Sequence, residues 1–178
     1  MDIGKTIEKV RFKIKFLGKF GIEYYQKTGI VKYEGFWENS KKNGKGIQYN
    51  YTANKEKEGI WTADIFEGKG WEYHKNGKIR YEGDMRVANK QGKGTLFYEN
   101  GQAKYQGMWF EDKMHGMGTI FKDCGTINYN GWWKSNEMHG KGILYDKFGH
   151  KKFEGEIESG QISGYGKKFL TKNNRSRI

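Results

Sequence analysis

The stretch Tyr-Gln-Gly-Met-Trp at 105–109, followed by His-Gly-Met-Gly at 115–118, returns 24 residues later as Tyr-Asn-Gly-Trp-Trp at 129–133 with His-Gly-Lys-Gly at 139–142. Six such units begin at residues 33, 57, 81, 105, 129 and 153; we number them units 1 to 6 and count places 1 to 24 within each. Places 3, 12 and 14 hold glycine in every unit, which accounts for eighteen of the 27 glycines. Self-similarity at a fixed period indicates a stack of equivalent structural units.

Aromatic residues follow the same period. Place 1 is aromatic except at Lys57, place 5 is tryptophan except at Met85 and Ile157, and place 17 is aromatic in every unit. Side chains alternate along a strand, so places 1, 3 and 5 share one face. The glycine at place 3 leaves a gap that flanking rings can fill.

Each unit has the pattern of a β-hairpin. A first strand at about places 1 to 6 precedes a turn region and the Gly-x-Gly, and a second strand carries place 17. Asn-Gly at 76–77 and at 100–101 predicts two-residue return turns, because these residues tolerate positive φ. No helical period and no apolar run long enough for a membrane-spanning helix occurs. We therefore expect an all-β fold, an elongated, trough-like single-layer antiparallel sheet of stacked hairpins, about 60 Å long at the usual strand spacing.

These residues and their spacing resemble MORN repeats (membrane occupation and recognition nexus), including Tyr-Glu-Gly-Phe-Trp at 33–37 with Asn-Gly-Lys-Gly at 43–46. The resemblance covers 33–169 and implies a twisted antiparallel sheet with an aromatic groove that serves as a protein-interaction scaffold, often in cilia and the cytoskeleton. Lys57, Met85 and Ile157 depart from the pattern, so the groove should be less aromatic there. The groove residues predicted to contact a partner are Tyr33, Trp37, Tyr49, Trp61, Tyr73, Tyr81, Phe97, Tyr105, Trp109, Phe121, Tyr129, Trp133 and Tyr145.

The repeats divide the chain into three parts. Residues 1–32 form a basic N-terminal strand and a degenerate repeat cap, 33–169 hold the six repeats, and 170–178 form a basic tail. The cap includes 21–29, which resembles the second half of a unit with one extra residue. Irregular end units are typical of stacked arrays.

Basic charge is concentrated at the two ends of the chain. The whole sequence has 33 Lys and Arg against 21 Asp and Glu. Residues 1–32 carry eight basic and three acidic groups, and 167–178 carry five basic groups and no acidic one. The repeats between them are nearly balanced, which disfavours a nucleic-acid-binding surface along the array. We expect no nucleic-acid partner.

The basic ends are candidate docking segments for an acidic surface. Residues 10–16 alternate apolar and basic side chains, which fits an extra strand covering the first hairpin or a cationic face that meets a microtubule, an acidic scaffold protein or anionic lipid. The two interpretations are compatible. The predicted docking residues are Lys9, Arg11, Lys13, Lys15, Lys167, Lys168, Lys172, Arg175 and Arg177.

Place 10 holds apolar residues where a polar turn is expected, at Phe66, Met114, Met138 and Ile162. They could pack against the neighbouring turn, or form a row at one sheet edge that a partner buries. Methionine suits an adaptable contact surface.

No pattern in the sequence indicates catalysis. His115 and His139 both occupy place 11, so we interpret them as turn residues, and the single cysteine, Cys124, offers no ligand set with them. Gly-Lys-Gly-Thr at 92–95 lacks the spacing of a phosphate-binding loop. We expect a non-enzymatic protein with no metal and no cofactor. One cysteine and no signal peptide favour a cytoplasmic, reducing setting.

The sequence thus predicts a scaffold that binds other proteins along its aromatic groove, as a subunit of a ciliary or axonemal assembly such as a radial-spoke-like or microtubule-associated complex. The alternative is a peripheral membrane adaptor that recognises acidic phospholipids through its basic ends. Edge-to-edge pairing of two copies stays open.

Overall fold

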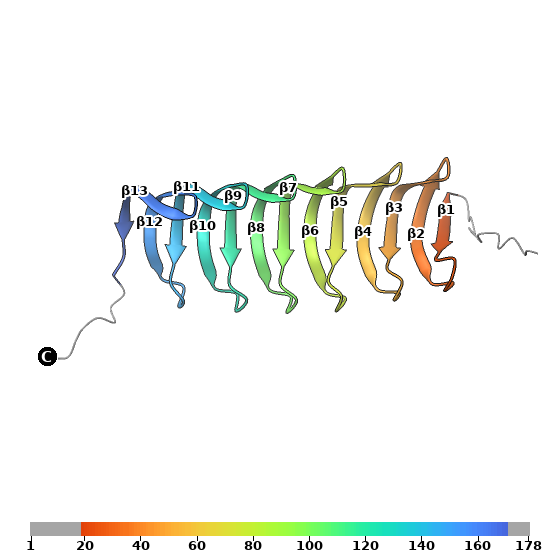
Figure 1. The fold of residues 1–178 in the computed structure, drawn as a ribbon, viewed down its shortest axis with the longest axis horizontal. Coiled ribbons are helices and arrows are strands. Elements are labelled where there is room, and N and C mark those ends of the chain that lie inside the picture. The colour runs from red at the N-terminus through yellow and green to blue at the C-terminus, as the bar shows by residue number, and fades with distance from the viewer. Residues whose placement is uncertain (1–18, 171–178) are drawn as a thin grey trace, which may run out of the picture.

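The computed structural model describes residues 19–170, which form a single antiparallel sheet of thirteen strands in sequence order. Figure 1 shows the strands side by side, with β1 at one end of the sheet and β13 at the other. The all-β prediction is confirmed. The strands are β1 (Phe20–Tyr24), β2 (Val31–Glu38), β3 (Lys41–Tyr49), β4 (Lys55–Thr62), β5 (Ile65–Tyr73), β6 (Ile79–Arg86), β7 (Asn89–Phe97), β8 (Ala103–Phe110), β9 (Lys113–Phe121), β10 (Ile127–Lys134), β11 (Glu137–Tyr145), β12 (Lys151–Glu158) and β13 (Gln161–Lys168).

Cross-strand glycine pairs fix the register of every hairpin. Gly35 lies opposite Gly46, and the place-3 and place-14 glycines pair in the same way in all six units. The register shifts just after the place-3 glycine in each hairpin. A second shift occurs at the end of the second strand, as between Gln48 and Tyr49. Such bulges change which side chains share a face.

The two kinds of turn differ from the sequence prediction. Within hairpins, places 7 and 8 both take positive φ, as at Val87 (49°) and Ala88 (61°), which is the pattern of a two-residue hairpin turn. At the predicted return turn, only Gly77 has positive φ, and its amide donates to the carbonyl of His74 at 2.9 Å. His74 also pairs with Lys78 across three loop residues. The two-residue turns therefore lie at the other end of each hairpin from where Asn-Gly suggested them.

The strand β1 lies where the second strand of a preceding unit would lie. Gly21 pairs with Gly35 of β2, as place 14 pairs with place 3 elsewhere. Nε1 of Trp37 donates to the Gly21 carbonyl at 3.2 Å. The segment 10–16, predicted as a further strand, lies outside the described residues.

The core of the sheet lies on one face. We call this the tyrosine face; it carries places 1, 3 and 5 of the first strand and places 10, 14 and 16 of the second. Places 2, 4, 13 and 15 form the opposite face. The buried hydrophobic side chains all lie on the tyrosine face: Tyr33, Trp37, Trp61, Phe66, Tyr81, Met85, Tyr105, Trp109, Tyr129, Trp133, Phe153 and Ile157.

Candidate interaction surfaces

Each tyrosine at place 1 lies over a pair of glycines. A Cβ atom added at Gly118 would stand 2.2 Å from the hydroxyl oxygen of Tyr105, and one at Gly107 would stand 2.6 Å from it. The hydroxyl donates to the carbonyl of Met108 at 2.9 Å, and the side chain is fully buried. The same arrangement occurs at Tyr33, Tyr81 and Tyr129. The glycine period therefore builds a socket for each tyrosine.

Each tryptophan at place 5 joins its unit to the one before. Nε1 of Trp133 donates to the carbonyl of Gly118 at 3.1 Å, and Trp109 bonds Gly94 at the same distance. Trp133 also stands edge-on to Tyr129 of its own unit, with ring centroids 5.3 Å apart. Edge-to-face pairs of this kind contribute about 0.5–1.5 kcal/mol beyond the burial of their area.

Unit 2 lacks the place-1 tyrosine and fills its socket from place 10. Phe66 is 2 % exposed, and a Cβ atom added at Gly70 would stand 2.3 Å from its ring. Nζ of Lys57, which replaces the tyrosine, lies 5.3 Å from the centroid of that ring. Phe66 thus takes over the tyrosine's role, a compensation between two places of one unit that the sequence period did not indicate.

In unit 1, place 10 is a lysine that covers an aromatic pair. Nζ of Lys42 lies 4.7 Å from the ring centroids of both Tyr33 and Trp61. Cations over ring faces are stabilised by about 0.5–2 kcal/mol. Burial lowers the pKa of Lys42.

In the later units, place 10 is apolar. Met114 and Met138 pack against the buried core while staying partly exposed, and Ile162 is 55 % exposed. All three lie in strands opposite place 5, not in the turns where the sequence had suggested them. Packing onto the core therefore accounts for part of their surface, and part remains available.

An ion-pair network covers the tyrosine face between units 2 and 4. Glu72, only 8 % exposed, lies within 3.8 Å of Lys57, 3.4 Å of Arg80 and 3.4 Å of Lys90. Lys90 also contacts Asp112 at 3.2 Å. Burial raises the pKa of Asp112, but hydrogen bonds from the backbone and side chain of Lys90 outweigh it and leave that pKa below its ordinary value. Carboxylates thus neutralise the cations of this half of the face.

Beyond Glu72 the same positions become apolar. Place 16, which is Gln48 and Glu72 in units 1 and 2, is Leu96, Ile120 and Leu144 in units 3 to 5. We use the name apolar strip for five partly buried side chains packed on the core, Leu96, Met114, Ile120, Met138 and Leu144. The tyrosine face is therefore polar in its first half and apolar in its second.

The opposite face exposes larger apolar side chains, at places the sequence prediction did not select. Phe36, Met108 and Trp132 at place 4 are 44, 37 and 51 % exposed, and Met117 at place 13 is 47 % exposed. Between β8 and β10 this face carries no charged side chain at places 2, 4, 13 or 15, where other units place glutamates and lysines. On the opposite face, the uncharged zone therefore covers unit 4 and the first strand of unit 5.

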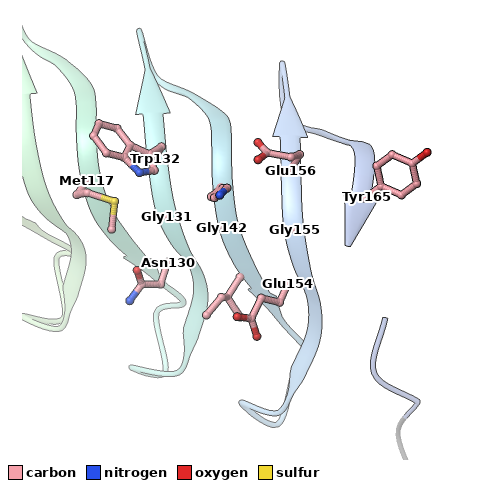
Figure 2. A pocket seen from close by; sticks show the side chains of 11 residues that line it. Met117, Asn130, Gly131, Trp132, Gly142, Glu154, Gly155, Glu156 and Tyr165 are labelled. Carbon is pink, nitrogen blue, oxygen red and sulfur yellow. The ribbon is translucent and has the colours of Figure 1, made fainter. Parts of the chain in front are cut away.

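Two shallow hollows lie on the opposite face. One, of about 350 Å³, is lined by Met117, Trp132 and Tyr165 together with Glu154 and Glu156. Figure 2 shows Met117 and Trp132 together at one side of it and Tyr165 at the other. The second, of about 540 Å³, lies near the N-terminal end and is lined by residues that include Phe20, Phe36, Ile60 and Trp71.

The structure separates the predicted groove residues into two groups. Those at places 1 and 5 are at most 8 % exposed, so they form the floor of the tyrosine face, and a partner there would meet places 10 and 16. Those at place 17 lie on the opposite side: the hydroxyl of Tyr49 donates to Glu34 at 2.6 Å, and that of Tyr73 donates to Glu58 at 2.7 Å. Burial and the bond to Glu34 raise the pKa of Tyr49 to about 12. Their contact with a partner stays a prediction.

Only two of the predicted basic docking residues belong to the described part of the chain. Lys167 and Lys168 are exposed on the edge strand β13. Lys9, Arg11, Lys13, Lys15, Lys172, Arg175 and Arg177 lie outside residues 19–170.

The described residues contain no cluster of three His, Cys, Asp or Glu side chains placed to hold a metal ion. Within 19–170 there is likewise no helix long and apolar enough to cross a membrane. His115 lies in β9 opposite Met108, and His139 lies in β11, so both are strand residues and not turn residues as the sequence suggested. Cys124 is exposed.

The model of the MORN repeat family matches six segments, which together cover more than half of the chain: 33–50, 58–79, 81–103, 105–123, 129–147 and 153–175. The chain is a MORN-repeat protein. The six matches begin within one residue of the six units, so the glycine sockets and tryptophan links are features of its MORN repeats. A search of curated proteins found no match to this MORN-repeat protein.

Proposed function

We propose that this MORN-repeat protein is a non-enzymatic scaffold that binds other proteins through the surface of units 3 to 5. The observation that carries the proposal is the change from polar to apolar side chains on the tyrosine face of units 3 to 5, together with the uncharged stretch of the opposite face from β8 to β10. The tyrosine face carries the apolar strip there, and the opposite face carries Met108, Met117 and Trp132. Contiguous exposed apolar surface is typical of interaction sites.

The rigid floor explains how such a surface could bind. The tyrosines and tryptophans beneath the apolar strip are held by ring contacts and hydrogen bonds, so their conformational entropy is already lost before a partner arrives. Methionines at Met114 and Met138 can adjust to the shape of the partner. Binding would then gain mainly from burial of apolar area, in repeated increments along the array.

The assembly we propose is cytoskeletal, with a ciliary or axonemal complex of the radial-spoke or microtubule-associated kind as the specific candidate. Membership of the MORN family supports a scaffold associated with the cytoskeleton or a membrane. The balanced charge of the repeats fits a protein partner better than a polyanion.

A second candidate function is a peripheral membrane adaptor for acidic phospholipids. It is favoured by the C-terminal edge, where Lys167 and Lys168 are exposed beside Tyr165, which is 97 % exposed, and Phe169. Aromatic and basic side chains together suit a membrane interface.

Site-specific photo-crosslinking in native assemblies distinguishes the two functions. A photoreactive residue in place of Met114 or Met108 should capture a protein, whereas the same residue at exposed Lys69 in unit 2 should not. Binding to phosphoinositide vesicles that is salt-sensitive and unaffected by Met114→Glu and Met108→Glu, with no captured protein, would instead establish the membrane adaptor.

A further inference from the structure

We propose that the apolar strip takes an acidic amphipathic peptide segment, one that carries apolar side chains in its centre and carboxylates at its flanks. This inference rests on the proposed scaffold function and specifies the chemistry of the partner. It is derived from the contacts between place 16, on the tyrosine face, and place 24 of the same unit, compared along the array.

In the first half of the sheet these two places are matched in polarity. Lys32 contacts Glu23, the β1 residue at the equivalent of place 16, at 2.8 Å. Glu56 accepts a hydrogen bond from Gln48 at 3.1 Å. In the next unit, Arg80 contacts Glu72 at 3.4 Å. Each of these place-24 residues therefore has its polar partner at place 16 within the chain.

In the second half, place 24 is Lys104 in unit 3, Asn128 in unit 4 and Lys152 in unit 5, and the residues at place 16 are all apolar. Lys104 follows Leu96 by the same eight residues that separate Arg80 from Glu72, and Lys152 follows Leu144 in the same way. Both lysines are exposed, and neither forms an ion pair with another residue of 19–170. The positive charge of Lys104 and Lys152 thus borders the apolar strip without an internal carboxylate to neutralise it.

The neighbouring carboxylates do not supply the missing charge. Asp112 is held by Lys90 at 3.2 Å, and the Asp146 side chain accepts hydrogen bonds from the backbone amides of Phe148 and His150. Nζ of Lys104 instead lies 5.4 Å from the ring centroid of Tyr98. A partner that buries the strip must therefore bring its own negative charge to the lysines, or leave them partly desolvated and unpaired.

The length of the strip sets the size of the partner segment. Leu96 and Leu144 lie two units apart, which is about 20 Å at the usual strand spacing. A segment of about six extended or thirteen helical residues covers this distance. The strip therefore suits a short linear segment of a larger protein.

Selection from a random peptide library tests the inference without assuming a conformation. Peptides of roughly 16 residues, displayed on phage, are selected against the immobilised full-length chain, and enriched peptides are measured by fluorescence anisotropy. We expect enriched peptides to combine apolar and acidic residues. Their affinity should fall about tenfold or more for the double variant Lys104→Glu with Lys152→Glu.

A second variant tests the strip through the chain's own chemistry. Leu96→Glu places a carboxylate near Lys104, as Glu72 lies near Arg80 in the unit before. The variant should therefore fold normally and weaken peptide binding by about the same factor as the double lysine variant. Lys69→Glu changes an exposed lysine of the opposite face in unit 2, outside the proposed binding surface, so it is the matched control and should leave affinity unchanged. If Leu96→Glu lowers the unfolding midpoint, the inference is tested by the exposed Lys104→Glu and Lys152→Glu changes alone.

Basic or uncharged enriched peptides, or affinities that are unchanged in the Lys104, Lys152 and Leu96 variants, would overturn the inference. Failure to enrich any peptide would also overturn it. Failure of the scaffold proposal is seen separately, as the absence of photo-crosslinks at both Met114 and Met108. Crosslinks at Met114 without an acidic preference would reject the acidic segment and leave the scaffold intact.

Discussion

Trp133 stands edge-on to Tyr105 of the preceding unit, with ring centroids 5.5 Å apart and ring planes at 88°. The same relationship joins Tyr33 to Trp61 at 5.5 Å and Tyr81 to Trp109 at 5.6 Å. At these three junctions the buried rings of successive units are in direct contact, so the stability of the array depends on nearest-neighbour interfaces.

Adjacent tryptophans provide a direct test of this role. Trp133→Ala removes the contacts with Tyr105 and Tyr129 and the bond to Gly118, and should lower the free energy of unfolding by about 3–5 kcal/mol. Trp132, 51 % exposed on the opposite face, is the matched control, and Trp132→Ala should cost less than about 1 kcal/mol. Urea denaturation followed by circular dichroism measures both. Equal losses would contradict a core confined to the tyrosine face.

The tyrosine socket predicts strong coupling between Gly118 and Tyr105. Gly118→Ala should destabilise the protein by about 1–3 kcal/mol, because the nearest atoms to the new methyl group all belong to Tyr105. In a Tyr105→Ala background the same change should cost less than about 1 kcal/mol. Additive losses in this double-mutant cycle would show that the glycine is required for another reason.

The buried tyrosines predict a loss of stability at alkaline pH. Burial raises the pKa of Tyr129 to about 12, whereas an unfolded tyrosine ionises near pH 10. Tyr129 therefore stays protonated to a higher pH in the folded state than in the unfolded state. Its contribution to the free energy of unfolding is complete below about pH 10 and is lost as the pH rises toward about 12. Tyr129→Phe should show a shallower decline of the urea midpoint between these values. Parallel curves for the two proteins would contradict the burial of this hydroxyl.

The network around Glu72 predicts a large effect of removing one charge. Glu72→Gln leaves Lys57 and Arg80 without a carboxylate and Lys90 with Asp112 alone, and it should cost about 2–3 kcal/mol. Glu154, which pairs with Lys151 on the surface, is the control, and Glu154→Gln should cost less than about 1 kcal/mol. Thermal unfolding at low and high salt compares the two. A loss no larger than that of the control would mean that the network does not stabilise the array.

The repeat period predicts the strand number and the glycine sockets because both depend on residues within one or two units. It does not predict the faces, because each hairpin contains bulges that change the alternation. Tyr49 was therefore grouped with Tyr33, although its hydroxyl meets Glu34 on the opposite side. The repeat period likewise places Phe66 in a loop. Its position over Gly70 depends on Lys57 standing where other units have an aromatic residue.

The proposed binding surface was the part least predictable from the sequence. Its signal lies in differences between units, such as the change from Glu72 to Leu96 at place 16, and not in what the units share. The aromatics that the units share at places 1 and 5 are buried and form the floor of the tyrosine face. The residues that distinguish one unit from the next, at places 10 and 16, lie above these buried rings.

The tryptophan bond to the place-14 carbonyl of the unit before has a consequence for spacing. Where place 5 is tryptophan, the bond uses only a backbone carbonyl of the unit before. A unit of this kind can therefore be inserted or removed without a new kind of contact, and each such step lengthens or shortens the sheet by two strands, about 10 Å. The length of the sheet therefore changes in fixed steps of one unit. Duplicating 105–128, the unit that contains Trp109, would place two more strands between the Lys90–Asp112 ion pair and Met138.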